Sequence, residues 1–126
     1  KEKRTKQRIR HFWYMDIWAN GNTYLQQRTA KDIWQGLYEP YLIEGDYDET
    51  SICQHPFIQQ INATIIGISP AYKHVLSHQT IIAHFVRLTV TTDHAFPDGL
   101  VKINGTEIEN YPVPQLIVRY RRLNKQ

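Results

Sequence analysis

The alternation of hydrophobic and polar positions predicts a chain of short strands with two helices. The longest segment, residues 8–19, is rich in aromatic and aliphatic side chains. We interpret it as a long strand with both faces partly covered. The pair Asn20-Gly21 follows, and it favours a two-residue hairpin turn because both central positions of a type I′ turn require a positive φ. Residues 23–28 then return as the partner strand.

Short apolar segments continue through the rest of the chain. They predict further strands over residues 41–44, 63–69, 72–77 and 80–91, and weak strands over 101–103 and 107–108. The segments 72–77 and 80–91 are expected to form a hairpin whose tip is Ser77-His78-Gln79. Residues 93–99 are predicted to be a loop.

Two segments have helical character. Proline is favoured at the first helical position, so His55-Pro56 can open a helix that carries Phe57, Ile58 and Ile61 on one stripe. Residues 115–123 place four apolar side chains on one helical face: Leu116, Ile117, Tyr120 and Leu123. The predicted fold class is therefore α+β, with a mixed or antiparallel sheet, a mid-chain helix and a C-terminal helix.

Composition is typical of a globular domain. The 126 residues are 41% hydrophobic and 21% charged, which favours one domain with a real core. No apolar run approaches the roughly 20 residues that cross a bilayer, and no apolar segment follows the basic start as in a signal peptide. Cys53 is the single cysteine, which excludes a disulfide or a cysteine metal cage within these residues. We expect a cytoplasmic protein without membrane contact.

The net charge of +3 hides an asymmetry. Six basic residues lie within positions 1–10 and four within 119–125, which leaves five basic against eleven acidic residues between them, about −6. The basic ends are either solvated tails or contacts to phosphate. Residues 1–7 contain no apolar side chain, so we interpret them as a linker or disordered entry to a domain over 8–126. The start at Lys1 predicts a piece of a longer polypeptide.

Three motifs occur in order along the chain. Leu25-Gln-Gln-Arg28 leads into a Trp-x-Gly-Leu-aromatic-Glu-Pro segment at 34–40. The other two are Tyr72-Lys-His-Val-Leu-Ser-His78 and the proline-led segment 111–117. Together they resemble the Nudix-like C-terminal domain of the MutY family, bacterial adenine DNA glycosylases that act opposite 8-oxoguanine. The hairpin motif of that family usually ends in Phe-Ser-His, and Leu76 replaces the phenylalanine here.

The resemblance implies a recognition domain without its own catalytic residues. In that family the catalytic acids and a 4Fe-4S cluster belong to a preceding helical domain, so this segment is expected to hold no cofactor and to be inactive alone. The implied partners are double-stranded DNA that contains an 8-oxoguanine:adenine pair and the catalytic domain of the same polypeptide. The parent enzyme extrudes and removes the mispaired adenine during base-excision repair.

By the same resemblance, the lesion would be recognised at the hairpin tip. Oxidation of guanine turns the N7 acceptor into an N–H donor, and a serine hydroxyl can accept from it. The expected lesion contacts are Ser77, His78, Leu76 and Gln79, and the expected phosphate contacts are Lys3, Arg4, Lys6 and Lys73. The alternative is that Ser77-His78-Gln79 is only a polar turn.

Two other function classes stay open. A Nudix hydrolase holds Mg²⁺ with an Arg-Glu-x-x-Glu-Glu helix, because that spacing places the carboxylates on one face. Here the acids Asp46, Asp48 and Glu49 are followed by residues 50–56, which contain none. We therefore predict no catalytic residues and no metal ligands. The remaining alternatives are hydrolysis of a damaged nucleoside diphosphate derivative and a protein-interaction module on the same fold.

Overall fold

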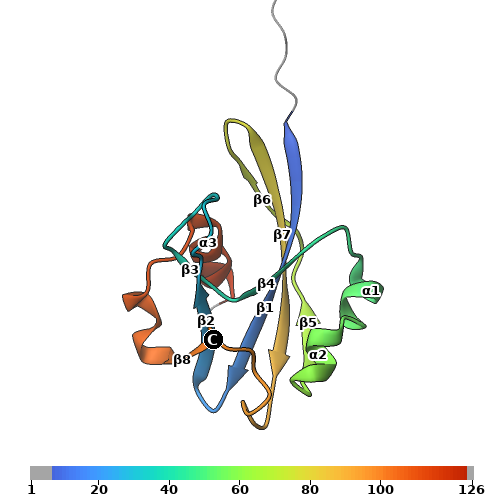
Figure 1. The fold of residues 1–126 in the computed structure, drawn as a ribbon, viewed down its shortest axis with the longest axis vertical. Helices are drawn as coiled ribbons and strands as arrows, with labels where there is room; N and C mark the ends of the chain where they lie inside the picture. Colours follow the sequence, from blue (N-terminus) through green and yellow to red (C-terminus); the bar gives the residue numbers. More distant parts are fainter. Residues whose placement is uncertain (1–6, 125–126) are drawn as a thin grey trace, which may run out of the picture.

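In the computed structural model, which describes residues 7–124, a mixed sheet forms the centre of the molecule (Figure 1). The strands are β1 (Arg8–Ala19), β2 (Asn22–Gln27), β3 (Tyr38–Glu39), β4 (Tyr41–Glu44), β5 (Thr64–Ile68), β6 (Tyr72–Val75), β7 (Gln79–Thr89) and β8 (Val101–Asn104). The helices are α1 (Glu49–Cys53), α2 (Pro56–Gln60), the 3-10 helix η1 (Gly105–Asn110) and α3 (Gln115–Leu123). The predicted α+β class is confirmed.

The two long strands β1 and β7 run parallel at the centre of the sheet. Their register pairs Arg8 with Gln79 at one end and Ile17 with Leu88 at the other. The strand order is β3-β2-β1-β7-β5, with β4 added to β1, β6 to β7 and β8 to β2 in antiparallel pairings. Because β1 and β7 are parallel, the start of β1 lies beside the tip of the β6–β7 hairpin (Figure 1).

Side chains of β1 alternate between two cores, as the period of a strand requires. Trp13, Met15 and Ile17 pack with α1 and α2 on one face. Phe12 and Tyr14 pack with α3 on the other face. The predicted strand with both faces covered is thus confirmed, and the helices cover opposite sides of the sheet (Figure 1).

The turn between β1 and β2 has the predicted geometry. Asn20 and Gly21 have φ angles of 53° and 76°. These values place both central residues in the left-handed region, which Asn and Gly enter at low cost. The Asn-Gly signal therefore fixes the register of this hairpin.

Several local predictions were wrong, each for a physical reason. A capping box between Asp48 and Ser51 starts α1, a helix that the sequence analysis did not predict. The side chain of Asn104 accepts from the Thr106 N–H at 2.9 Å and starts η1 where a weak strand was expected. Gln79 is the first residue of β7 rather than part of the tip. Leu123, in the last turn of α3, is exposed rather than packed.

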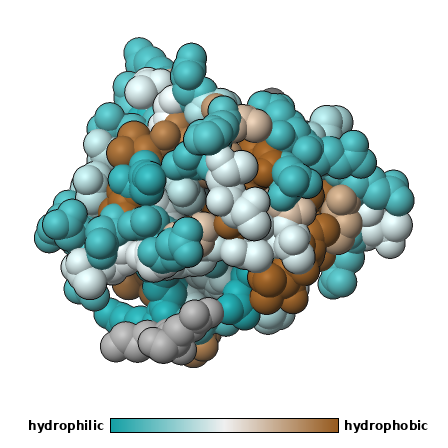
Figure 2. Space-filling model, turned by 90° about the horizontal axis from the view of Figure 1, so that it is seen from below, coloured by the Kyte–Doolittle hydropathy of each residue, from teal (hydrophilic) through white to brown (hydrophobic). Residues whose placement is uncertain are grey.

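A few large hydrophobic side chains stay at the surface. They are Ile9, Trp18, Ile66, Val75, Val101 and Leu123. The end of the molecule seen in Figure 2 carries separate hydrophobic patches within a mostly hydrophilic surface. None of the helices within residues 7–124 is long and apolar enough to cross a bilayer.

Candidate functional site

The β6–β7 hairpin tip consists of Leu76, Ser77 and His78 and projects from one end of the sheet (Figure 1). The Leu76 N–H donates to the Gln79 carbonyl at 2.8 Å and closes the turn. The Leu76 side chain is partly buried and packs against the core that α3 covers. The side chains of Ser77 and His78 are exposed. The tip thus has one anchored residue followed by two polar residues that face solvent.

Hydrogen bonds from Gln7 and Arg8 support the backbone of this tip. The Gln7 Nε2 donates to the Leu76 carbonyl at 2.9 Å and to the Ser77 carbonyl at 3.4 Å. The Thr80 hydroxyl donates to the Gln7 Oε1, and the Arg8 N–H donates to the His78 carbonyl at 3.3 Å. Consequently the three tip carbonyls accept hydrogen bonds from residues 7 and 8. Within residues 7–124, the Ser77 hydroxyl has no hydrogen-bond partner.

A buried guanidinium lies below the tip. Arg10 is only 7% exposed, and five hydrogen bonds use all of its N–H groups. Nε and Nη2 donate to both Glu44 oxygens at 2.8 Å, and Nη1 and Nη2 donate to both Asp32 oxygens at 3.0 and 2.9 Å. The last N–H donates from Nη1 to the Gln79 Oε1 at 3.1 Å. Arg10 therefore joins β1, the 28–37 loop, β4 and the hairpin.

This arrangement changes the acidity of the carboxyl groups. The hydrogen bonds from Arg10 lower the pKa of Asp32 to about 2, and they also lower the pKa of Glu44. A second arginine, Arg28, donates to Asp32 at 2.9 Å and to Glu39 at 3.0 Å. Glu39 is 2% exposed, and burial raises its pKa although the nearby Arg28 opposes the rise. Two arginines and three carboxylates thus form one connected network.

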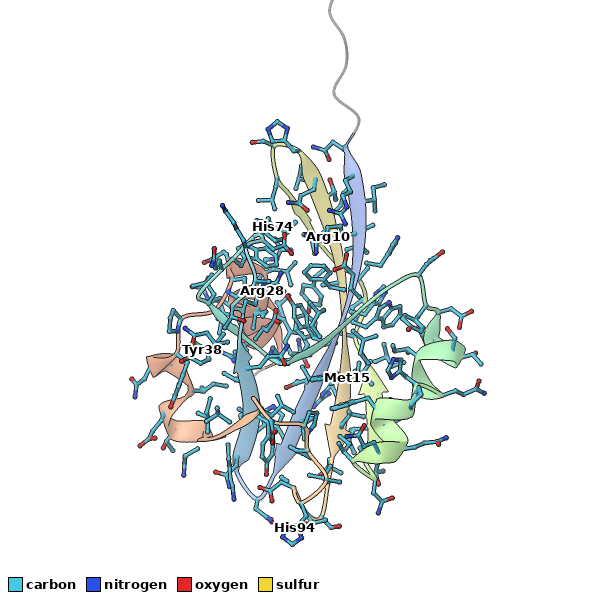
Figure 3. The ribbon with its side chains drawn as sticks, in the orientation of Figure 1. Arg10, Met15, Arg28, Tyr38, His74 and His94 are labelled. Atoms are coloured by element: carbon cyan, nitrogen blue, oxygen red, sulfur yellow. The ribbon has the colours of Figure 1, made fainter. Side chains whose placement is uncertain are left out.

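The loop after β2 packs onto the hairpin through an aromatic contact. Trp34 has a φ of 59°, a left-handed conformation that costs a non-glycine residue about 1–2 kcal/mol. Its ring contacts Phe12 and His74 edge to face, with centroids 6.2 and 5.7 Å apart. His74 lies near Arg10 and Arg28 at this end of the molecule (Figure 3). The loop therefore supports β6 from the side.

Two exposed basic side chains lie near the tip. Arg8 and Lys73 are exposed, and Arg119 on α3 donates to the Lys73 carbonyl at 2.8 Å. Of the residues expected to contact phosphate, Lys73 lies two positions before Val75 in β6, close to the tip. Lys3, Arg4 and Lys6 lie outside the described residues. Arg10, which the sequence analysis counted in the basic end, is neutralised by its carboxylate partners and does not face solvent.

The segment 45–60 differs from a magnesium-binding helix. The Asp48 carboxylate accepts from the Ser51 N–H at 2.8 Å and serves as the cap of α1. His55 caps α2 through Nδ1, which accepts from the Phe57 N–H at 3.1 Å. Across residues 7–124, no group of three or more His, Cys, Asp or Glu side chains is arranged to hold a metal ion. The acidic side chains of this segment therefore have structural roles or face solvent.

Comparison with protein families identifies the family of this domain. The profile of the NUDIX domain matches residues 13–122, which is most of the sequence. The chain belongs to the NUDIX domain family. A comparison of the sequence with curated proteins finds no match.

Solved structures with the NUDIX fold resemble the chain at low sequence identity. The C-terminal domain of mouse MUTYH, solved in complex with human PCNA, has a TM-score of 0.62 at 15% identity, over 90% of this chain and 86% of that one. The E. coli ORF135 protein has a TM-score of 0.56 at 18% identity, over 90% and 86%. The Nudix hydrolase RenU of M. smegmatis has a TM-score of 0.56 at 12% identity, over 92% and 85%. These likenesses concern the fold.

Sequence reasoning brought together only part of the candidate site at the hairpin tip of this NUDIX domain. It placed Ser77 and His78 at a hairpin tip, where the structure has them, but it put Leu76 in the preceding strand and Gln79 in the tip. It missed Gln7 and Arg10, which support the tip from the start of the chain. The spacing of the residues contains a signal for the burial of Arg10. Every second residue of a strand lies on the same face, so Arg10 shares a face of β1 with Phe12 and Tyr14, which belong to the core.

We predict that Gln7→Ala loosens the tip without unfolding the domain. The variant loses the bonds to the Leu76 carbonyl and the Thr80 hydroxyl, which costs about 1 kcal/mol of local stability. Hydrogen exchange of the Leu76 amide should accelerate about fivefold. Gln59→Ala, at an exposed position of α2, is the control and should leave that amide unchanged. Equal exchange in wild type and Gln7→Ala would contradict the proposed support.

We also predict that Asp32→Asn reduces stability in a pH-dependent way. The pKa of Asp32 is about 2 in the folded state against an ordinary value of 3.8. A lowered pKa stabilises the fold above pH 3.8, and this contribution is lost as the pH falls toward 2. The Asp32 side chain is 31% exposed, so solvent screening limits the contribution to about 1 kcal/mol.

Urea unfolding between pH 2 and pH 7 measures this contribution. The difference between wild type and Asp32→Asn should be largest at neutral pH and should shrink toward pH 2. Asp46→Asn, which changes an exposed carboxylate outside the network, should show no such trend. A difference that stays constant with pH would show that the Arg10–Asp32 contact does not act through charge.

Proposed function

We propose that this NUDIX domain recognises 8-oxoguanine in DNA, as the non-catalytic C-terminal domain of a bacterial adenine DNA glycosylase of the MutY family. Adenine removal would belong to the preceding catalytic domain, with its 4Fe-4S cluster. In this proposal the partners of the domain are DNA with an 8-oxoguanine:adenine pair and that catalytic domain. The mouse MUTYH C-terminal domain, which shares the fold, is compatible with this assignment.

One observation carries the proposal: the Ser77 hydroxyl is exposed at the end of a supported hairpin. The tip carbonyls already accept from Gln7 and Arg8, so they are held away from a ligand. Ser77 and His78 project from this fixed backbone with exposed side chains. A tip of fixed shape can insert a hydroxyl at a base edge without first ordering the loop, which would cost binding energy.

The chemistry of the lesion suits a hydroxyl. Normal guanine presents an acceptor at N7, whereas 8-oxoguanine presents an N–H donor at that position. The Ser77 oxygen can accept from this donor and can donate to a neighbouring carbonyl. Replacing the lesion with guanine would set two acceptors against each other or force the hydroxyl to reorient. Such a mismatch costs about 1–3 kcal/mol.

The basic residues near the tip favour contact with the phosphates of duplex DNA. Lys73 is exposed on β6, and Arg8 is exposed at the start of β1. Together with Lys3, Arg4 and Lys6 from the sequence analysis, they would contact phosphates and add a salt-dependent affinity that does not depend on sequence. Leu76 packs inward and anchors the tip, and Gln79 is held by Arg10. In this proposal Leu76 and Gln79 therefore position Ser77 and His78.

We predict that Ser77→Ala combined with His78→Ala lowers lesion selectivity. The full-length glycosylase that carries this domain would be assayed for adenine excision opposite 8-oxoguanine and opposite guanine. The ratio of the two rates should fall at least about fivefold, because the discriminating acceptor, worth about 1 kcal/mol or more, is gone. Excision opposite guanine should change little.

Two controls define the range of this assay. Thr50→Ala removes an exposed hydroxyl on α1, which packs on the face of the sheet opposite to α3. This variant should leave the ratio of the two excision rates unchanged. An enzyme without residues 1–126 sets the lower limit of selectivity. If the double variant keeps the wild-type ratio while the deletion loses it, the domain matters but the tip assignment is wrong. If the deletion also keeps the ratio, the proposed function is wrong.

We further predict that the chain does not hydrolyse 8-oxo-dGTP with Mg²⁺. Within the described residues, segment 45–60 lacks the row of carboxylates on one helical face with which a Nudix hydrolase holds the cation against a diphosphate, and Asp48 caps α1 instead. Release of pyrophosphate or phosphate from 8-oxo-dGTP, in the presence of Mg²⁺ or Mn²⁺, measures this activity. A catalytic Nudix hydrolase serves as the positive control. Turnover that needs the metal and follows this chain through purification would favour the hydrolase alternative.

A further inference from the structure

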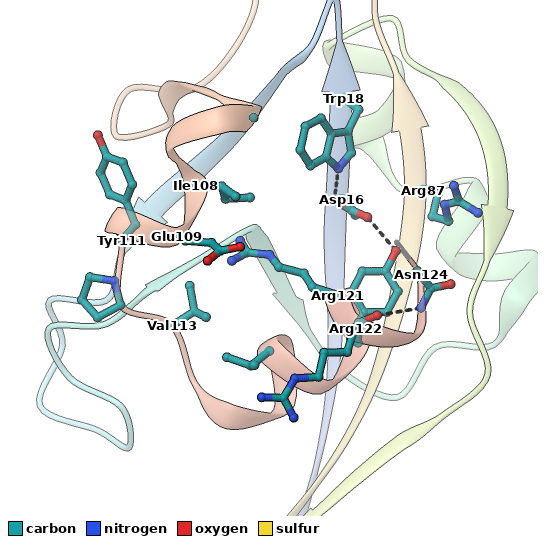
Figure 4. Close-up of a pocket in the computed structure, with 14 residues that line it drawn as sticks. Asp16, Trp18, Arg87, Ile108, Glu109, Tyr111, Val113, Arg121, Arg122 and Asn124 are labelled. Carbon is teal, nitrogen blue, oxygen red and sulfur yellow. Dashed lines mark hydrogen bonds between the residues drawn. The ribbon is translucent and has the colours of Figure 1, made fainter. Parts of the chain in front are cut away.

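A cavity lies at the opposite end of β1 from the hairpin tip. It has a volume of about 770 Å³ and opens between η1 and α3 (Figure 4). Asp16 and Trp18 of β1 line it, eight and ten residues along the strand from Arg8, or about 26 and 33 Å. The cavity exists because α3 covers the sheet face at Phe12 and Tyr14 but leaves Trp18 38% exposed.

Three arginines line this cavity: Arg87 on β7 and Arg121 and Arg122 on α3. Within residues 7–124, none of the three forms an ion pair or a side-chain hydrogen bond, in contrast with Arg10 and Arg28. Arg121 is half-buried, and burial lowers its pKa. The Asp16 and Glu109 carboxylates lie close enough to oppose this fall in pKa. No acceptor within residues 7–124 forms a hydrogen bond with the guanidinium, so its position favours a further anion that accepts from it.

The two carboxylates that line the cavity differ in their hydrogen-bond partners. Asp16 is already committed, because its Oδ1 accepts from the Trp18 indole N–H at 2.9 Å and its Oδ2 accepts from the Tyr120 hydroxyl at 2.6 Å (Figure 4). Glu109 on η1 is exposed and has no ion pair in the described part of the chain. Three cations against these two groups leave the cavity net positive.

The remaining wall is apolar and aromatic. Ile108 and Tyr111 contribute from one side, and Val113 and Val118 contribute from the other. The indole of Trp18 adds a flat surface. A cavity of about 300–1,000 Å³ that combines apolar walls with a few polar groups is typical of small-molecule sites.

We infer that the cavity between η1 and α3 binds a small organic anion with a planar or apolar body. The body packs between Trp18 and the Val113–Val118 wall, and its phosphate or carboxylate group meets Arg121 and Arg122. Arg87 contributes from the sheet. This site shares no residue with the hairpin tip, so it is independent of the proposed recognition of DNA.

Titration of the 126-residue chain with phenyl phosphate tests the site by NMR. The indole N–H resonance of Trp18, assigned from a Trp18→Phe sample, should shift and saturate with a Kd on the order of 1 mM. Phenol, which has the ring without the anion, and inorganic phosphate, which lacks the ring, should each bind at least about tenfold more weakly. Benzoate tests which anionic group the cavity binds. An affinity equal to that of phenyl phosphate would show that the cavity binds carboxylates as well, and a weaker affinity would show that it prefers phosphates.

Variants on the same helix provide matched controls. Arg121→Gln should weaken phenyl phosphate at least about tenfold, and Arg119→Gln, which lies outside the cavity, should leave its Kd unchanged. Because Arg121 is half-buried, the exposed Arg122→Gln serves as a second test and should weaken binding severalfold. Glu109→Gln should strengthen binding about threefold by removing a repelling charge. Absence of a saturable shift, equal binding of phenol, or an unchanged Kd in both arginine variants would overturn the inference.

Discussion

The fold and the proposed recognition tip both depend on one buried guanidinium. Burying a charge is unfavourable unless its partners satisfy every donor, and Arg10 meets this condition with Asp32, Glu44 and Gln79. Those partners come from a loop, a short strand and the hairpin, which hydrophobic contacts alone would not hold in register. The guanidinium also lies 5.0 Å from the centroid of the Phe12 ring, which links the polar network to the core. The position of the hairpin tip therefore rests on charge pairing inside the domain.

The neighbouring loop shows how strain supports the same end of the molecule. Trp34 accepts a left-handed backbone so that its ring can reach both Phe12 and His74. Arg28 holds the ends of this loop by bonds to Asp32 and Glu39. Contacts within the chain therefore account for the conformation of this loop. The segment that would carry catalytic carboxylates in a Nudix hydrolase instead has helix caps at Asp48 and His55.

Sequence reasoning worked where the signal was local. The alternation in 8–19 and the Asn-Gly pair need only neighbouring residues, and both predictions were confirmed. The network around Arg10 could not be predicted in this way, because Asp32 and Glu44 lie 22 and 34 residues away. The start of η1 was missed because a side-chain cap at Asn104 outweighed a weak strand pattern. The exposure of Leu123 depends on how far α3 extends over the sheet, which periodicity does not give.

The parallel pairing of β1 with β7 has a consequence for how the domain folds. The partners are 71 positions apart, from Arg8 with Gln79 to Ile17 with Leu88, so a long stretch of chain must be ordered before they meet. Contacts of such high separation slow folding and form late. A synthetic hairpin of residues 72–89 would lack the entire first strand. Its tip would lose the hydrogen bonds from Gln7 and Arg8 that fix its shape in the intact domain. The geometry of the three tip residues therefore depends on the folding of the whole domain.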